Sequence, residues 1–384
     1  MDIGVFNVIF GIITGIVVLV ILVAVHELGH GIVARRNGVV LEEFGIGFPP
    51  RAFAKKLKNG VVFSLNWLPL GGFVKLQGEH DAASKKGDYG AATFWQKTKI
   101  LLAGVLVNWV VAAVLLTILA LVGLPKILPN QFSVPADTNL STGPVVLSSV
   151  VKDYPAAKAG LQSGDKIISI DGQKITTPDQ LIAQTKADRG KTVTVDYTRD
   201  GTPASKKVTL RDANTAVFGS TLSQTQSIRA TWSAPIVGVA TTGQFTWVTI
   251  QGLGQLLANL VTGIFGQLSP DQTTRKAAST NLAAAGDSVA GPIGILGTIF
   301  PAASKAGPKE VLFLAAVISL TLAVMNTLPI PSLDGGRWFV TALYKVRKQK
   351  LTKEKEEKIQ AIGFSVLMIL VVVVTIGDVT KLFK

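Results

Sequence analysis

Hydrophobic residues gather into four windows, each long enough to cross a lipid bilayer as a helix. The windows cover residues 5–33, 100–124, 311–328 and 362–379. A hydrocarbon core about 30 Å thick requires roughly 20 apolar residues at a rise of 1.5 Å per residue. The pattern therefore predicts a polytopic α-helical membrane protein with four transmembrane helices. A signal peptide is the alternative for the first window, but no basic segment precedes it, so we expect a retained anchor.

A fifth apolar stretch, residues 235–268, contains no charged residue but has two different faces. Its apolar face holds Leu253, Leu256, Leu257, Leu260, Val261, Ile264 and Phe265, and its polar face holds Gln251, Gln255, Asn259 and Thr262. This pattern is typical of an amphipathic helix that lies on a membrane surface or packs on other helices. We therefore predict a surface helix at this point.

Composition and charge agree with a membrane protein that has some extramembrane mass. Charged residues make up 16% of the 384 residues, against roughly 25% in an average soluble domain. Eleven Lys and Arg lie in the loop of residues 31–99 and eight in residues 337–358. The positive-inside rule places both loops in the cytoplasm and residues 125–308 outside. The net charge of +14 is thus partly a topology signal, and no motif supports nucleic acid as a partner.

The chain contains no cysteine. This excludes a disulfide framework, a cysteine-based metal site and a cysteine nucleophile.

One region, residues 143–212, is soluble in character. Short β-branched runs at residues 145–151, 166–170, 192–199 and 207–210 alternate with Gly and Asp turns, and residues 177–187 favour a helix. The stretch "AAKAGLQSGDKIISIDGQ" resembles a circularly permuted bacterial PDZ domain. PDZ domains capture extended peptides by adding a strand to a sheet. The resemblance implies that a peptide or a substrate ectodomain binds here, with a carboxylate-binding loop near Gly143–Val146; a spacer or cap is the alternative.

The stretch "VAVHELGHGIVARR", residues 23–36, places three ionisable groups at the end of the first apolar window. His26 and His30 are four residues apart, so on a helix they share one face and can hold one metal ion. Glu27 lies beside them, where a carboxylate can take a proton from metal-activated water. Ionisable groups at membrane depth cost about 3 kcal/mol each, which favours a functional role over helix-end histidines bonded to backbone. His80, in a polar stretch, is expected to be a solvated loop residue.

A catalytic zinc ion usually takes three ligands from the protein, so the two histidines require a third partner. The best candidate is Asp334 in "NTLPIPSLDGGRW", residues 326–338, just after the third apolar window. Prolines before it break the helix, and Gly335 and Gly336 allow the backbone to approach a site closely. A simple Asp-Gly turn at a helix end is the alternative for this stretch taken alone.

Taken together, HELGH on a first membrane helix and NTLPIPSLDGG after a later one resemble the site-2 protease family of intramembrane metalloproteases. The resemblance covers nearly the whole chain. "FSLNWLPLGGFVKLQGE", residues 63–79, is similar to the family's re-entrant membrane β-hairpin, "LLAGVLVNW" to the start of its second helix, and "SVAGPIGI" to the lead into its third. Two departures are Pro49, where relatives often have Gly, and a single PDZ-like unit where some relatives have two.

The resemblance implies a division of the chain into nine parts. These are a first transmembrane helix (1–36), a cytoplasmic loop with the membrane β-hairpin (37–99), a second helix (100–124), a linker (125–142), the PDZ-like domain (143–212), an extracytoplasmic segment with the surface helix (213–307), a third helix with LDGG (308–336), a basic cytoplasmic loop (337–360) and a fourth helix with the C-terminus (361–384). Asp334 must meet the histidines near the cytoplasmic side, and a single extra crossing at residues 235–268 would place it on the wrong side.

The family implies an intramembrane zinc metalloprotease in the bacterial cytoplasmic membrane, with its PDZ-like domain extracytoplasmic. Its Zn²⁺ ligands would be His26, His30 and Asp334, and its general base would be Glu27. Asn326 is similar to a family asparagine that holds the substrate backbone, and Gly71, Gly72, Phe73 and Val74 would offer a strand to the unwound substrate. Single-span membrane proteins such as anti-sigma factors are the expected substrates, with remnant signal peptides as a second class.

Two hypotheses from other classes compete with this one. A metal transporter would use the same three ligands in transit, but it would not require Glu27, and no further polar residues line a path across the membrane. An inactive PDZ scaffold would be expected to lack the glutamate or a ligand, and this chain retains all four groups.

Overall fold

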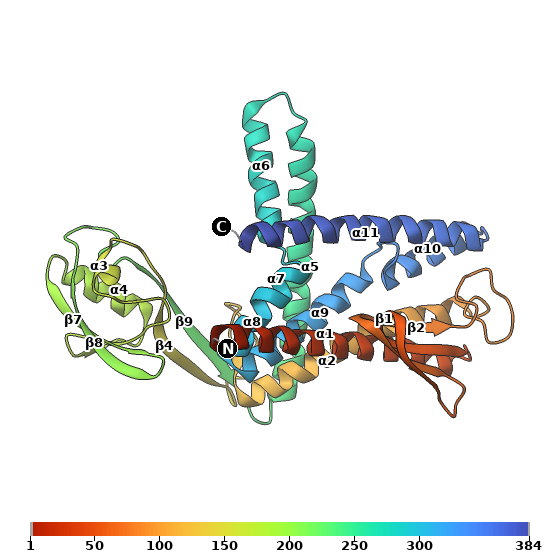
Figure 1. The fold of residues 1–384 in the computed structure, drawn as a ribbon, viewed down its shortest axis with the longest axis horizontal. Coiled ribbons are helices and arrows are strands. Elements are labelled where there is room, and N and C mark those ends of the chain that lie inside the picture. Colours follow the sequence, from red (N-terminus) through yellow and green to blue (C-terminus); the bar gives the residue numbers. More distant parts are fainter. Residues whose placement is uncertain (1–2, 383–384) are drawn as a thin grey trace. The chain divides into compact units, whose positions relative to one another are not determined.

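The computed structural model describes residues 3–382, which form two compact units (Figure 1). The first unit combines the chain up to Leu119 with the chain from Ala234 onward, and the second is Ala120–Ser233. The second unit is thus an insertion in the first, and each has its own packing.

Five long helices build the first unit. They are α1 (Ile3–Arg36), α2 (Phe94–Val122), α5 (Ala234–Gln267), α9 (Pro308–Thr327) and α11 (Lys353–Leu382). All five are long and apolar enough to cross a membrane. Four of them correspond to the four predicted windows. The fifth is the stretch predicted as a surface helix, so length and hydropathy alone do not give the predicted count of four.

Helix α5 continues into α6 (Gln272–Asp287), and the two form a hairpin. In Figure 1 this hairpin runs across the direction of α1, α2 and α11. The first half of α5 is packed: Gly238 lies against Thr117 of α2, and Trp109 of α2 donates a hydrogen bond of 3.1 Å to Thr246. The second half lies against α6 and exposes its apolar face, which contains Leu257, Val261, Ile264 and Phe265. Gln255 and Thr262 of the predicted polar face are exposed as well.

A bent β-hairpin follows α1. Its strands are β1 (Leu41–Lys56) and β2 (Val62–Leu76). The first part of β1, residues 41–46, pairs with residues 72–76 on one side and with residues 62–65 on the other. The segment 72–76, called the edge strand below, therefore pairs with β1 on one side, while α1 contacts β2. Residues 51–56 pair with 62–66 and form the outer strand of the hairpin.

Short helices connect α6 to α9 and pack on α1 and α11. They are α7 (Pro292–Gly294), a π-helical turn η1 (Ile295–Ile299) and α8 (Phe300–Ala306). Gly11 and Gly15 of α1 leave the space that Pro301 and Phe300 occupy. The buried carboxylate of Asp378 in α11 accepts the backbone N–H groups of Gly291 and Gly294. These contacts fix the lead into α9.

The third predicted helix, with its apolar window at residues 311–328, ends where the prolines were expected to break it. Helix α9 ends at Thr327, and Asp334 begins a new helix, α10 (Asp334–Val346). Pro329 and Pro331 cause the break, because proline cannot donate the backbone hydrogen bond that a helix interior needs. The basic segment expected as a loop, residues 337–360, accordingly contains most of α10 and the start of α11.

The second unit is a seven-stranded sheet with two short helices. Its strands are β3 (Leu124–Pro125), β4 (Asn139–Val150), β5 (Lys166–Ile170), β6 (Gln173–Lys174), β7 (Thr192–Arg199), β8 (Thr202–Thr209) and β9 (Ser220–Arg229), and its helices are α3 (Pro155–Lys158) and α4 (Pro178–Ala187). The order is β3-β9-β4-β5-β7-β8, with β6 paired to β5. A core of buried aliphatic residues, among them Val145, Leu147, Ile167, Ile170 and Leu181, lies against this sheet.

Most local predictions for this unit are confirmed, including the helix at residues 177–187 and the tight turn at Asp171 and Gly172. Both turn residues have a positive φ. The predicted end at residue 212 is wrong, because β9 pairs along β4 inside the sheet. The sequence of β9, STLSQTQSIR, is polar and half-buried, so it has little of the hydrophobic signal on which strand prediction depends.

Candidate active site

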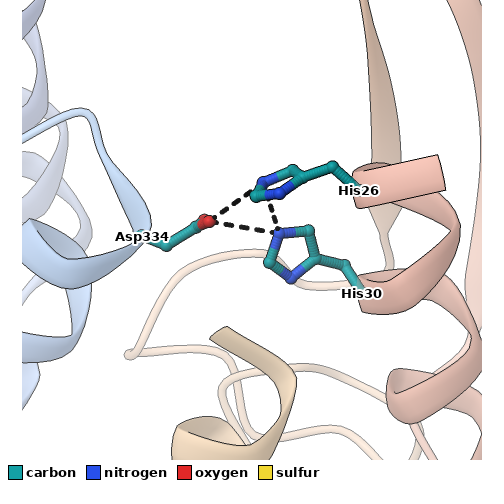
Figure 2. A group of neighbouring side chains, drawn as sticks. All are labelled: His26, His30 and Asp334. Atoms are coloured by element: carbon teal, nitrogen blue, oxygen red, sulfur yellow. Dashed lines mark hydrogen bonds and ion pairs between the residues drawn. The ribbon is translucent and has the colours of Figure 1, made fainter. Parts of the chain in front are cut away.

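Two histidines of α1 and one aspartate of α10 converge at one point (Figure 2). The Nε2 atoms of His26 and His30 each lie 3.2 Å from Oδ2 of Asp334 and 3.1 Å from one another. Residues more than 300 positions apart in the chain are thereby brought into contact, as the sequence predicted.

The local structure of α1 explains how the two histidines share one site. Residues four apart lie one helical turn apart on the same face, so both rings point away from α1 in one direction. Both residues are buried, with 7% and 8% of their surface exposed. Gly29, on the same helix, leaves room for Val107 and Ala103 of α2. The close approach of α2 covers the histidines on that side.

Asp334 reaches the site because its turn is tightly packed. A side chain at Gly336 would overlap the carbonyl group of Ile330, and one at Gly335 would overlap that of Thr327. The two glycines therefore let the first turn of α10 fold back onto the end of α9. Burial acts to raise the pKa of the Asp334 carboxyl group, but the contacts with the two histidine rings outweigh it and hold this pKa well below its usual range. The carboxylate is thus present as an anion.

The three side chains fit a divalent metal ion. Their ligand atoms, one from each residue, all lie within 4.8 Å of one another. Two imidazoles and one carboxylate are a donor set typical of catalytic zinc, which leaves a further position open. The Nδ1 atom of each histidine has its own hydrogen-bond partner on α2, so Nε2 is the atom that each ring presents to Asp334. Fixed rings with converging Nε2 atoms are what a metal site requires.

Glu27 borders a cavity of about 430 Å³ that also reaches His30 and Asp334. Its carboxylate accepts a hydrogen bond from the backbone N–H of Val74 in the edge strand. Phe73 and Val74 line the same cavity. The structure therefore places the predicted base, two of the three predicted ligands and part of the predicted strand around one space.

A second polar cluster that lines this cavity was not predicted. Arg337 of α10 is paired with Glu79 at 2.9 Å and with Glu356 of α11 at 3.4 Å, and its guanidinium group lies 4.5 Å from the centre of the Tyr89 ring. Burial lowers the pKa of Arg337, but the surrounding phenol and carboxylates outweigh it and raise this pKa above its usual range. Burial also raises the pKa of Tyr89. This cluster joins the loop after β2 to both C-terminal helices.

His80 does not behave as the solvated loop residue that the sequence suggested. It is half-buried, it lines the cavity, and its Nδ1 atom is buried without a hydrogen-bond partner in the described part of the chain. The residues on either side of it contact the C-terminal helices, since Glu79 pairs with Arg337 of α10 and the N–H of Asp81 donates to Glu356 of α11. Its neighbours in sequence are polar and gave no sign of this.

The other predicted substrate-binding residues occupy different places. Gly72 is buried against Val23 and Glu27 of α1. Gly71, the residue before it in the chain, has a positive φ of 131°. Asn326 lies half-buried in the last turns of α9, and it is not among the described residues that line the cavity. The sequence missed a stripe on α2 formed by Ile100, Gly104 and Asn108, which contacts both histidines. A polar asparagine within an apolar helix was the available signal.

The second unit contains a cavity of its own, about 200 Å³ in volume. Its lining comes from α4 and from the segment that leads into β9, including Leu181, Ile182, Lys186 and Phe218. The expected carboxylate-binding loop at Gly143–Val146 is wrong, because Val145 is paired with β9 on one side and β5 on the other. One side of β9 pairs with β4. Among the described residues, the strand that pairs with its other side is the two-residue β3, so most of that side has no strand partner.

Comparisons with known proteins agree with this arrangement. The sequence model named peptidase family M50 matches residues 14–370. The regulator of sigma-W protease RasP from Bacillus subtilis is 26% identical, over 97% of this chain and 99% of that protein. The zinc metalloprotease RasP from Shouchella clausii is 28% identical, over 95% and 97%. A crystal structure of the PDZ domain of an SdrC-like protein from Listeria monocytogenes is 28% identical, over 21% of this chain and 86% of that one, with a TM-score of 0.19.

Proposed function

Because the chain belongs to peptidase family M50, the site-2 proteases, and is a zinc metalloprotease of that type, we propose that it hydrolyses a peptide bond within the transmembrane segment of another membrane protein. The observation that carries the proposal is the convergence of His26, His30 and Asp334 beside Glu27, in a cavity that adjoins long apolar helices. A multi-pass bacterial membrane protein with such a site can reach a bond inside the bilayer.

In this proposal His26, His30 and Asp334 hold Zn²⁺. When bound, the ion supplies a Lewis acid that polarises the scissile carbonyl group and lowers the pKa of water toward 7. The Nε2 atoms of the histidines and Oδ2 of Asp334 are the donor atoms, since these are the atoms that converge.

Glu27 is the proposed general base. Its carboxylate borders the same cavity as His30 and Asp334, so it can take a proton from the attacking water and later give it to the nitrogen of the leaving amine. The hydrogen bond from the Val74 N–H holds the carboxylate in place. The base is thus oriented by the strand that is proposed to hold the substrate.

The edge strand, residues 72–76, is the proposed substrate clamp. A transmembrane helix satisfies its own backbone hydrogen bonds, so a substrate must unwind before its peptide bond can be attacked. An unwound segment can pair with a free sheet edge by strand addition. The N–H groups of Val74 and Leu76 point to Glu27 and Glu79, so this side of the strand faces the site. Asn326 is proposed to hold the substrate backbone on the other side.

We assign four membrane crossings, to α1, α2, α9 and α11. Helix α5 begins beside Thr117 near the end of α2, and α6 ends where Lys381 near the end of α11 donates to the Gly286 carbonyl. The α5–α6 hairpin thus starts and ends near the same ends of the bundle and adds no net crossing. The basic loops then lie in the cytoplasm with the site near them, and the second unit lies outside.

The second unit is proposed to act as a PDZ domain that meets substrate ectodomains. Its cavity lies between α4 and β9, beside the free side of β9, where an extended peptide could add as a strand. The Bacillus subtilis relative is named as a regulator of a sigma factor, which supports anti-sigma factors as the substrate class. Remnant signal peptides are the second class we propose.

The test is cleavage of a single-span reporter protein, co-expressed with wild type, Glu27→Gln and Asp334→Ala, together with the zinc content of each purified protein. We expect Glu27→Gln to keep zinc and lose cleavage by at least about 10²-fold, since general-base catalysis contributes about 10²–10⁴-fold. Asp334→Ala should lose both zinc and cleavage. Wild-type protein that binds zinc but cleaves nothing, even without its second unit, would support an inactive scaffold. Wild-type protein without zinc would contradict the site.

A further inference from the structure

Helix α2 presents a stripe of three positions to the two histidines. Ile100, Gly104 and Asn108 are four residues apart, so they lie on one face of α2, one turn after another. The carbonyl oxygen of Ile100 lies 2.7 Å from Nδ1 of His30. Asn108 Nδ2 lies 3.2 Å from Nδ1 of His26. Each histidine therefore has one partner on α2 at the ring nitrogen that faces away from Asp334.

Gly104 makes this arrangement possible. A Cβ atom at this position would overlap Nε2 of His30 and lie 2.6 Å from Cε1 of His26. The rings thus fill the space that a side chain would take. Because the backbone of α2 comes this close, the groups one turn before and one turn after Gly104 reach the two Nδ1 atoms.

The two Nδ1 partners are not equivalent. A neutral histidine that gives Nε2 to a metal carries its proton on Nδ1 and must donate it to an acceptor. The Ile100 carbonyl is always an acceptor, so it suits His30 in this state. Asn108 carries both an acceptor and a donor, because its amide has an oxygen on one side and an NH₂ group on the other.

The surroundings of Asn108 show which groups are satisfied. Its side chain is buried, with 1% of the residue exposed, and its Oδ1 has no hydrogen-bond partner in the described part of the chain. With Nδ2 toward His26, Nδ1 acts as an acceptor and Oδ1 is left unpaired. Rotation of the amide by half a turn places Oδ1 on Nδ1. That orientation pairs the buried oxygen and requires the proton of His26 to be on Nδ1.

From this geometry, and resting on the proposed zinc site, we propose that Asn108 is a positioning residue for the metal. Its amide oxygen accepts the Nδ1–H of His26, which leaves Nε2 of His26 free as a ligand. Without the metal, its NH₂ group donates to Nδ1, and Nε2–H of His26 faces Asp334 and His30. By rotation of its amide, Asn108 thus forms a hydrogen bond with Nδ1 of His26 both with and without the metal.

The position of Asn108 is itself held from the other side of the site. Ser319 of α9 is fully buried, and its Oγ donates a hydrogen bond of 2.9 Å to the backbone carbonyl of Asn108. Helix α9 leads directly to the turn that carries Asp334. Asn108 therefore lies in a chain of contacts that connects α1, which carries the histidines, to α9, which leads into the turn of Asp334.

The experiment compares zinc affinity among variants of the full-length protein, measured by competition with a chromophoric chelator. Asn108→Leu removes the acceptor and keeps a similar volume, and Asn108→Asp keeps an acceptor. Loss of such a supporting partner typically weakens metal affinity 10–100-fold. We expect a loss in that range for Asn108→Leu and a change of less than about threefold for Asn108→Asp. Gly243→Ala in α5, where a Cβ atom meets nothing within 4 Å, should bind zinc like wild type.

A second readout separates positioning from mere packing. The chain has three histidines, so labelling with ¹⁵N-histidine gives few ring signals. In zinc-loaded wild type, both site rings should carry the proton on Nδ1. In zinc-free wild type the His26 ring should carry its proton on Nε2. In zinc-free Asn108→Leu it should lose this preference, while the His30 ring, held by Ile100, should keep its proton on Nδ1. Should the Leu variant fail to fold, Asn108→Ala removes the amide without adding bulk and should give the same result.

Two outcomes would overturn the role of Asn108 and leave the proposed metal site intact. One is a zinc affinity in Asn108→Leu and Asn108→Ala within about twofold of wild type. The other is an equal loss in Asn108→Asp and Asn108→Leu, because the acceptor would then not be what matters. Wild-type protein that takes up no zinc would overturn the metal site and this role with it, so the failure of the proposed function is distinguished from the failure of the inference.

Discussion

At the scale of single residues, the site depends as much on missing side chains as on present ones. Gly104 leaves room for two histidine rings, and Gly335 and Gly336 leave room for the carbonyl groups that the Asp334 turn folds against. A site of this kind tolerates little change in volume.

Gly104→Ala should therefore weaken zinc binding. Its Cβ would overlap the His30 ring, and overpacking of this kind costs about 1–3 kcal/mol, which corresponds to roughly 5–150-fold in affinity when the metal site carries the strain. Zinc competition on the purified protein is the measurement. Gly243→Ala in α5 is the matched control, since a Cβ there meets nothing within 4 Å and zinc affinity should not change. Equal affinity in both variants would show that α2 can move away.

A second residue-scale feature is the buried ion pair of the second unit. Asp165 is fully buried and accepts two hydrogen bonds of 2.7 Å from Arg199 and one of 2.8 Å from the backbone of Gln162. Burial raises the pKa of Asp165, but these hydrogen bonds outweigh it and lower the pKa below its usual range. A carboxyl group with a lowered pKa in the folded state stabilises the fold above its unfolded pKa, near 4, and this contribution is lost as pH falls through the folded pKa.

We expect Asp165→Asn to destabilise the second unit by about 2 kcal/mol at pH 7, less than for a fully buried pair because a third of the Arg199 side chain is exposed. The difference between variant and wild type should shrink as pH falls below about 4, because the Asp165 carboxyl group of the unfolded chain then takes up a proton while that of the folded chain still resists it. Hydrogen exchange of β5 and β7 in the full-length protein, measured at several pH values, would show this. A difference that stays constant to the lowest pH at which the protein folds would contradict the assigned cause.

At the scale of secondary-structure elements, the edge strand connects the base to the proposed substrate. Residues 72–76 pair with β1 on one side, and on the other side the N–H groups of Val74 and Leu76 point to carboxylates. The outer strand, residues 51–56, lies at the opposite edge of the same hairpin. One hairpin thus has an edge at the site and an edge away from it.

Cysteine cross-linking can distinguish these two edges, because the chain contains no native cysteine. In a Glu27→Gln background, we expect cysteines at Phe73 or Val74 to form disulfides with a cysteine placed in the transmembrane segment of a reporter substrate. Cysteines at Ala52 or Ala54 of the outer strand should not. Cross-linking yield on denaturing gels is the measurement, and equal yields at both edges would argue against a substrate strand at residues 72–76.

At the scale of the whole molecule, the second unit is inserted at a point where its two ends meet. The N–H of Ala230 donates a hydrogen bond of 2.8 Å to the carbonyl of Ala120, and Leu124 pairs with Ile228. Domains whose ends lie close together can be inserted or removed with little strain on the remainder. The proposed metal ligands and Glu27 all belong to the first unit.

Replacement of residues 125–227 by a short glycine-rich turn should therefore leave zinc binding intact. We expect the shortened protein to cleave a reporter without an ectodomain at about the wild-type rate, and to cleave one with a bulky ectodomain faster than wild type does, because the proposed filter is gone. Rates for the two reporters, normalised to zinc content, are the measurement. Slower cleavage of both reporters at full zinc content would indicate that the second unit delivers substrates and does not exclude them.

The sequence by itself determined the features that depend on short-range periodicity. The four apolar windows, the pairing of His26 with His30 one turn apart, and the turn at Asp171 and Gly172 all follow from the local geometry of helices and hairpins. The choice of Asp334 as the third ligand was also correct in placement, because its stretch carries its own helix-breaking and close-packing signals.

The tertiary structure alone decided which distant groups complete the site and the sheet. Asn108, His80 and Arg337 acquire their surroundings only when α2, the loop after β2 and the C-terminal helices pack together. Strand β9 was missed for the same reason, since a half-buried polar strand is defined by its partner β4 and not by its own hydropathy. Contacts between residues far apart in the chain leave no periodic trace in the sequence, so only the packed molecule shows them.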